Sequence, residues 1–326
     1  MEQISDSRNE HDEWWGVHHP VEGDLVGMSY LYYAKNLCGG NDYVLPHKEC
    51  TQKEKVKLLL WGDSYTYKLK DSAFPCASPY MFGRRLFQTL EYTIDTSKRN
   101  ILVIEVTERN LLEYFSNTGI FDYLKKSNED KASNIPAVPE NADENKWSFD
   151  YWLSRIFNHN INPNLEYNLF NYNILQAPRK LKAFFNYRVF GRASGNVVLS
   201  YDKKYLLLKE TLYKYGTSSS YTMLTPKTIN DVVATLNEVY RHYKADGFDE
   251  VYLSIIPNPV TILQPQQYNG LIPAIQGNLL LRMKCIDIYT SFTKTKEEIY
   301  RHGDTHWNST GISMWVDEVN KTIAAN

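Results

Sequence analysis

The chain of 326 residues lacks any apolar run approaching the roughly 18 to 20 residues that a membrane-spanning helix requires. The start at residues 1–6 has neither the basic residues nor the hydrophobic segment of a signal peptide. We therefore expect no membrane span in this chain. The polar stretch up to Trp14 also fits a tether behind a removed export signal or anchor.

An excess of charge of either sign is also missing. The chain has 36 basic and 38 acidic residues, which give a formal net charge of -2. Binding to nucleic acid or to an anionic membrane usually needs a basic excess, so composition favours neither partner. The chain is 43% hydrophobic, which is enough to fill one large or two small cores.

Cysteine is scarce, with four residues and no CxxC pair, so zinc or redox motifs are not expected. Cys38 and Cys50 bracket a glycine-rich loop and form either a disulfide in an oxidising compartment or two free thiols. The adjacent His18 and His19 do not predict a metal site, because neighbouring side chains diverge and no acidic ligands accompany them. We expect no metal and no cofactor.

Short apolar runs alternate with segments of helical periodicity, which predicts an α/β fold with a mainly parallel sheet. The expected strands are 55–61, 100–106, 251–256 and 285–289. The expected helices are 80–92, 228–243, 271–282 and one from 309 to the C-terminus. Gly247 stands where a helix-ending glycine is expected.

The predicted organisation is an N-terminal extension over 1–54 and one α/β domain over 55–326. Residues 128–220 interrupt its rhythm, since they are rich in Asn, Tyr and Phe and hold one plausible β segment at 196–200. This insertion either builds part of the substrate surface or forms an irregular cover.

A serine follows the first predicted strand in the sequence Trp-Gly-Asp-Ser-Tyr, at Ser64. A serine at the carboxyl end of a parallel strand lies in a tight turn, where backbone N–H groups favour a developing oxyanion. Serine becomes a nucleophile when an imidazole held by a carboxylate accepts its proton. The sequence must therefore supply a histidine and an acid.

These residues occur just before the last predicted helix. Asp304 and His306 stand two positions apart, so both side chains point the same way on an extended loop. His302 is a competing base, but His306 has the acid at short spacing and an aromatic neighbour. We expect a triad of Ser64, His306 and Asp304.

The chain resembles the SGNH/GDSL hydrolase superfamily, in which Gly-Asp-Ser follows the first strand and an Asp and a His precede the last helix. Its Asp304-Thr-His306-Trp, with Glu108-Arg109 after a strand, is similar to the alginate and cell-wall polysaccharide O-acetyltransferase branch. Two departures are clear. The usual SGNH spacing is Asp-x-x-His, and in those acetyltransferases the Asp-x-His-Trp block precedes the serine. The resemblance implies a three-layer, flavodoxin-like α/β/α fold.

The resemblance also implies oxyanion donors in middle blocks. Arg109 or Asn110 would donate together with the Ser64 N–H, and Glu108 would support them; the alternative for Glu108 and Arg109 is a structural ion pair. Gly83 is a candidate for the second block, or only a helix glycine. Tyr65 and Trp307 are candidates for substrate binding.

The implied function is a serine esterase or acyltransferase acting on O-acetyl groups of a polysaccharide, in the periplasm or elsewhere outside the cytoplasm. Its substrate is a carbohydrate or acyl ester, and its partner proteins would belong to a polysaccharide-modification system. The alternative is a non-catalytic carbohydrate-binding or polysaccharide-assembly protein on the same fold.

Overall fold

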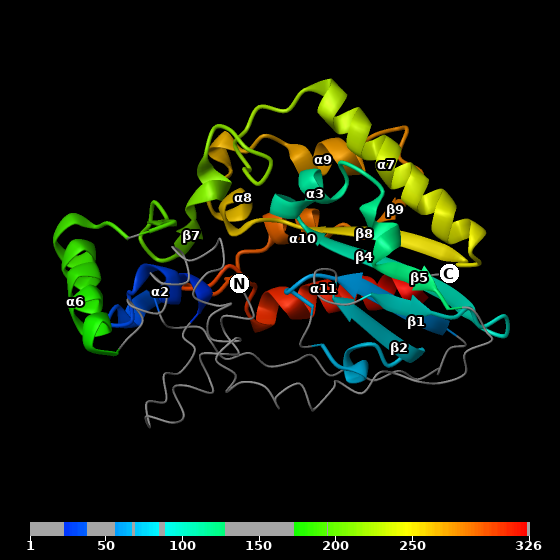
Figure 1. The fold of residues 1–326 in the computed structure, drawn as a ribbon, viewed down its shortest axis with the longest axis horizontal. Helices are drawn as coiled ribbons and strands as arrows, with labels where there is room; N and C mark the ends of the chain where they lie inside the picture. The colour runs from blue at the N-terminus through cyan, green and yellow to red at the C-terminus, as the bar shows by residue number, and fades with distance from the viewer. Residues whose placement is uncertain are drawn as a thin grey trace, which may run out of the picture.

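A five-stranded parallel sheet forms the centre of the computed structural model, which describes residues 23–37, 56–66, 69–84, 89–127, 173–193 and 195–324 (Figure 1). Its spatial order is β2-β1-β4-β8-β9. The strands are β1 (Val56–Gly62), β2 (Ala77–Arg84), β4 (Arg99–Thr107), β8 (Glu250–Ile256) and β9 (Lys284–Cys285). Each neighbouring pair is parallel, which confirms the predicted α/β class.

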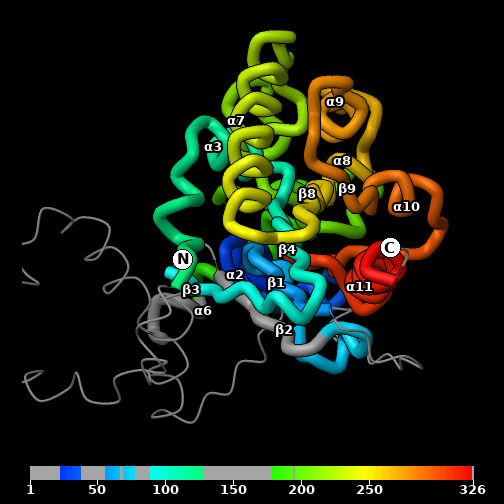
Figure 2. The backbone as a smooth tube through the Cα atoms, turned by 90° about the vertical axis from the view of Figure 1, so that its right-hand side faces the viewer, coloured from blue at the N-terminus to red at the C-terminus, as the bar shows by residue number. Residues whose placement is uncertain are grey.

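Helices cover both faces of this sheet. Leu58 and Leu60 of β1 pack on the side of α10 (Ile288–Lys294) and α11 (Ser309–Ala324). Leu59 and Trp61, which alternate with them, pack on the side of α3 (Glu108–Tyr114), α7 (Pro226–Ala245) and α9 (Leu271–Gln276). Figure 2 shows α3 and α7 on one side of the strands and α11 on the other. The fold is a three-layer α/β/α sandwich.

Helix α7 confirms the expected amphipathic segment, although it begins two residues earlier. Thr225 caps it by accepting a hydrogen bond from the Thr228 N–H at 3.1 Å, and Pro226 occupies the first turn. Gly247 follows with a φ of +109°, as expected for a glycine that ends a helix.

The helix expected over 80–92 is wrong. Residues 77–84 form β2, which pairs with β1 in a register that places Gly83 opposite Trp61. Residues 90–92 form β3 (Leu90–Tyr92), which pairs with β5 (Leu124–Lys126). The backbone N–H and C=O groups along one edge of β1 need hydrogen-bond partners, and β2 supplies them. This pairing determines the structure of residues 77–84, whereas their apolar spacing alone fits a helix or a strand.

Two further elements are shorter than expected. Helix α9 ends at Gln276, before Gly277, instead of continuing to residue 282. Strand β9 stops at Cys285, because Asp287 caps α10 by accepting a hydrogen bond from the Thr290 N–H at 3.0 Å. The final helix α11 begins at Ser309 as predicted.

A small third cluster joins the N-terminal part to the insertion. It contains α2 (Asp24–Ser29), α6 (Asn173–Phe190) and the antiparallel pair β6 (Val197–Leu199) and β7 (Leu206–Leu208). Strand β6 matches the expected β segment, whereas α6 was not predicted. The remaining short elements are η1 (Lys35–Leu37), η2 (Asp71–Ala73), η3 (Gly119–Asp122), η4 (Lys209–Leu212), α8 (Pro259–Leu263) and η5 (Pro265–Gln267).

Several expectations fall on other parts of the chain. Cys38, Cys50 and the pair His18 and His19 lie outside the described residues. Cys76 is disulfide-bonded, and Cys285 is a free thiol. Within the described ranges, no helix combines the length and the apolar character that crossing a membrane requires.

We predict that Gly311→Ala destabilises the protein, although alanine is normally the better helix former. A Cβ at Gly311 in α11 would lie 2.4 Å from the Ile299 carbonyl oxygen and 2.8 Å from the Trp307 Cβ. Relieving that overlap should cost about 2 kcal/mol of unfolding free energy in urea denaturation. Ser313→Ala in the same helix is the control, and an unchanged midpoint for Gly311→Ala would contradict the close packing.

Candidate active site

Ser64 lies in the turn that follows β1, at the carboxyl edge of the sheet. The Asp63 carboxylate accepts hydrogen bonds from the Tyr65 N–H at 3.0 Å and from the Thr107 N–H at 3.1 Å, so it ties the ends of β1 and β4 together. The Asp63 N–H donates to Glu105 at 2.8 Å. Among the described residues, no group accepts a hydrogen bond from the Ser64 N–H.

The loop before α11 is folded back on itself. Tyr300 and Trp307 form an antiparallel bridge, the Arg301 N–H donates to the His306 carbonyl at 3.2 Å, and the Asn308 N–H donates to the Ile299 carbonyl at 2.9 Å. These bonds close a compact turn that presents His306 at its surface. The imidazole is 23% exposed, so it is reachable while most of it is packed.

The turn after β1 and this loop bring Ser64, His306 and Asp304 together. The Ser64 Oγ lies 2.9 Å from the His306 Nε2. The His306 Nδ1 lies 2.6 Å from the Asp304 Oδ1, which also accepts the His306 backbone N–H at 2.9 Å. The three side chains therefore have the hydrogen-bonded order of a nucleophile, a base and an orienting acid.

The electrostatics of this trio favour a charged pair. Burial of the imidazole would lower the pKa of His306, but the hydrogen bond to Asp304 and the charges of Asp304 and Asp24 outweigh it, so the pKa is raised. Burial would raise the pKa of Asp304, but His306 and Arg301 outweigh it and hold the pKa well below its usual range. Asp304 is therefore ionised and favours a protonated imidazole.

Asp24 is a second acid beside His306 that the sequence did not indicate. Its Oδ2 lies 3.9 Å from the His306 Nδ1, and its Oδ1 accepts the Thr305 N–H at 2.8 Å. Partial burial and the negative charge of Asp304 raise the pKa of Asp24. The approach depends on Gly23, which has a φ of +125° and where a Cβ would lie 2.3 Å from the Gly303 carbonyl oxygen.

His302, the competing base, faces elsewhere. Its Nδ1 lies 3.2 Å from the Asn36 carbonyl oxygen, and its Nε2 lies 3.1 Å from the Glu298 carboxylate. The ring also packs edge-on against Tyr205. Both nitrogens are engaged, so the geometry favours His306.

Glu108 supports the loops behind the site. Its Oε2 accepts the Asn258 N–H at 2.9 Å and the Thr261 hydroxyl at 2.5 Å, and its side chain is buried. Burial raises its pKa to about 7. Among the described residues, no ion pair joins Glu108 to Arg109, so Glu108 acts through hydrogen bonds instead of the suggested pair.

Arg109 lies beside Tyr65, and its charge acts on His306. Its guanidinium carbon is 5.7 Å from the centre of the Tyr65 ring. Burial would lower the pKa of Arg109, but Tyr65, Asp63 and Asp24 outweigh it, so the side chain stays cationic. Asn110 is half-buried in the first turn of α3, and Gly83 lies on the edge strand β2 opposite Trp61, not on a helix.

Tyr65 and Trp307 are not substrate-binding surfaces in this structure. Their side chains are 1% and 0% exposed, and their rings pack edge-on at 5.1 Å. The Tyr65 hydroxyl donates to the Thr305 carbonyl oxygen. The prediction that they contact substrate is wrong, because both complete the hydrophobic core beneath the site.

Asp24, Asp304 and His306 are also close enough to share a metal ion, with one ligand atom from each within 4.8 Å of the others. In this arrangement the Nδ1 of His306 is bonded to Asp304, and both oxygens of Asp24 accept hydrogen bonds from Thr305. The atoms that could bind a metal ion therefore already form the hydrogen bonds that orient the imidazole.

Comparison of the chain with protein-family models, with curated proteins and with solved structures gives no significant match.

We predict that Asp24→Asn lowers the pKa of His306, because it removes a negative charge that stabilises the imidazolium. Titration of the His306 ring by NMR should show the shift, while Asp231→Asn on the exposed surface of α7 should leave the pKa unchanged. An unchanged or raised pKa in Asp24→Asn would show that Asp24 does not act on the imidazole.

The buried Glu108 should make stability depend on pH. Its pKa is about 7 in the folded chain and 4.5 ordinarily, so between these values the folded protein holds a proton that the unfolded chain has lost. Stability should therefore fall as pH rises through this window, by at most about 3 kcal/mol from this group.

Glu108→Gln should reduce that slope in urea denaturation from pH 4.5 to 7. Part of the slope will remain, since burial also raises the pKa of Glu105. Glu238→Gln on the surface of α7 is the matched control. A slope equal to that of the wild type would mean that Glu108 is ionised throughout.

Proposed function

We propose that the protein is an SGNH-like serine esterase or acyltransferase acting on O-acetyl groups of a polysaccharide. One observation carries the proposal, namely the chain of contacts from Ser64 Oγ to His306 Nε2 at 2.9 Å and from His306 Nδ1 to Asp304 at 2.6 Å. It lies at the carboxyl edge of a parallel sheet, where α/β folds place their ligands.

In the proposed mechanism the Ser64 Oγ attacks the acyl carbon as its proton passes to the His306 Nε2. The oxygen of the tetrahedral intermediate takes the negative charge and accepts a hydrogen bond from the Ser64 N–H, with Arg109 adding positive charge nearby. When the intermediate collapses, the bond to the sugar oxygen breaks and that oxygen takes the proton from His306.

The resulting acyl-enzyme is resolved by the same groups. His306 removes a proton from the acceptor, whose oxygen attacks the acyl carbon; the bond from the acyl carbon to the Ser64 Oγ then breaks, and that oxygen takes the proton back from the His306 Nε2. Water as the acceptor gives an esterase, and a sugar hydroxyl gives a transferase. Asp24 and Asp304 hold the imidazole and stabilise its positive charge in both half-reactions.

The choice of an O-acetylated polysaccharide rests on the resemblance of Asp304-Thr-His306-Trp and Glu108-Arg109 to the polysaccharide acetyltransferase branch. The same resemblance supports a place outside the cytoplasm and partner proteins of a polysaccharide-modification system. The disulfide at Cys76 favours an oxidising compartment. A non-catalytic carbohydrate-binding protein on this fold is the alternative.

We predict an acetyl adduct on Ser64 after incubation with an activated acetyl ester, detected by intact-mass and peptide mass spectrometry. Ser64→Ala should lose the adduct and lower the esterase rate by roughly 10³-fold or more. Ser97→Ala, at an exposed serine after β3, is the matched control and should behave as the wild type. Release of acetate, or its appearance on an added oligosaccharide, then separates the esterase from the transferase.

The rate should also rise with pH through the raised pKa of His306, because the base must be unprotonated. If the wild type forms no adduct with any activated acyl ester above that pKa, the non-catalytic alternative is favoured. An adduct that persists in Ser64→Ala would place the nucleophile elsewhere.

A further inference from the structure

Helix α6 carries a row of apolar side chains on the outer surface of the molecule. Leu181, Phe185 and Val189 are 65%, 56% and 57% exposed, and their spacing of four residues puts them on one face. Phe190, the last residue of α6, is 60% exposed and its ring lies 6.0 Å from that of Phe185, so it adjoins the end of the row although it lies about 100° round the helix from Val189. We call Leu181, Phe185 and Val189 the α6 apolar face.

The opposite side of α6 fixes which way this face points. Arg179 donates to the Tyr30 hydroxyl at 3.1 Å, Lys180 lies over the Tyr32 ring at 4.6 Å, and Ala183 is buried in the small third cluster. The helix is therefore anchored on the segment of α2, and the apolar face is turned outward by packing. Figure 1 shows α6 at one end of the molecule, away from α7 and the sheet.

Positively charged side chains flank the α6 apolar face. Residues 173–201 contain five Lys and Arg and no Asp or Glu. At 100° per residue, Lys182 lies on one flank of the row and Arg188 on the other, and both are exposed. The near-neutral total charge of the chain hides this local excess.

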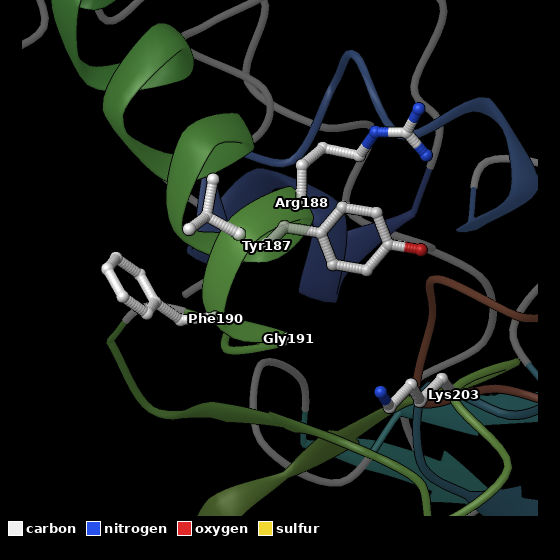
Figure 3. Close-up of a pocket in the computed structure, with 6 residues that line it drawn as sticks. Tyr187, Arg188, Phe190, Gly191 and Lys203 are labelled. Carbon is white, nitrogen blue, oxygen red and sulfur yellow. The ribbon is translucent and has the colours of Figure 1, made fainter.

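A shallow hollow of about 330 Å³ adjoins the end of α6 (Figure 3). It is lined by Tyr187, Arg188, Val189, Phe190, Gly191 and Lys203. The Lys203 Nζ lies beside Gly191, 3.5 Å from where a Cβ would stand. The described residues of the lining include two cations, Arg188 and Lys203, and no acid. Such a lining suits a phosphate group held next to apolar chains.

We propose that α6 is an interfacial helix that lies on an anionic lipid bilayer. The α6 apolar face would enter the boundary between headgroups and acyl chains, while Lys182, Arg188 and Lys203 contact lipid phosphates. An apolar row flanked by charge of one sign fits a lipid surface better than a folded partner, whose surface carries both signs. The proposal does not depend on the proposed catalysis.

The contact is tested by flotation of the full-length chain with vesicles of phosphatidylcholine, with and without 30 mol% phosphatidylglycerol. The wild type should float with the anionic vesicles at low salt and be released as salt increases. L181E/F185E and K182E/R188E should each lower the apparent affinity at least about tenfold. Both pairs are exposed, so circular dichroism and thermal melting should match the wild type.

Matched controls separate this face from exposed side chains in general. L279E/L280E replaces two apolar residues that are 100% and 67% exposed, and K294E/K296E reverses two exposed lysines; both should float as the wild type does. Absence of flotation at low salt, or variants of α6 that float normally, would overturn the proposal. A wild-type dimer that L181E/F185E converts to monomer, without vesicle binding, would assign the face to a second copy.

Discussion

The candidate site depends on one buried contact, the hydrogen bond from the Tyr65 hydroxyl to the Thr305 carbonyl oxygen. Tyr65 follows the serine and Thr305 precedes the histidine, so this bond joins two turns whose functional groups are 242 residues apart in sequence. Burial raises the pKa of Tyr65 well above its ordinary value, which keeps the phenol a donor. Trp307 packs against the Tyr65 ring and against Trp315. This close packing holds the two turns in a fixed position relative to each other.

The buried carboxyl groups around this contact are of two kinds, those with a raised pKa and one with a lowered pKa. Glu105 and Glu108 lie deep behind the serine turn, where burial raises their pKa values and favours the neutral acid. Asp304 is equally enclosed, yet its bond to His306 and the charge of Arg301 lower its pKa. Negative charge is thereby concentrated beside the imidazole, where it stabilises the protonated form of His306.

The sequence was sufficient where neighbouring residues determine the structure. The amphipathic stripe predicted α7, and buried apolar runs predicted β1, β4 and β8. The serine was likewise predicted at the end of β1, and the acid and the histidine were predicted from their spacing in the loop before α11. Strand β2 was missed, since its pairing with an exposed edge is a tertiary effect that apolar spacing does not encode.

The rest of the site depends on long-range contacts. Asp24 accepts a hydrogen bond from Thr305, which is 281 positions away in sequence. The contact requires a glycine at position 23, because a Cβ there would overlap the Gly303 carbonyl oxygen, and this requirement is visible only in the folded chain. An aromatic residue next to a catalytic candidate suits a sugar platform and a core equally well, and burial decided for the core at Trp307. Burial is likewise needed to interpret α6, because the sequence does not show that Arg188 lies on the exposed side of this helix.

Net charge is a property of composition, but a membrane responds to charge within a Debye length of about 10 Å. In α6, folding sorts the cations of one short segment into two groups. Arg179 and Lys180 turn inward to tyrosines of the α2 segment, whereas Lys182 and Arg188 are exposed, with the Arg188 guanidinium over the Phe184 ring at 5.8 Å from its centre. Arg179 and Lys180 hold the helix against the α2 segment, and Lys182 and Arg188 give its outer surface a positive potential. A chain with a net charge of -2 therefore presents a cationic face where its apolar side chains are exposed.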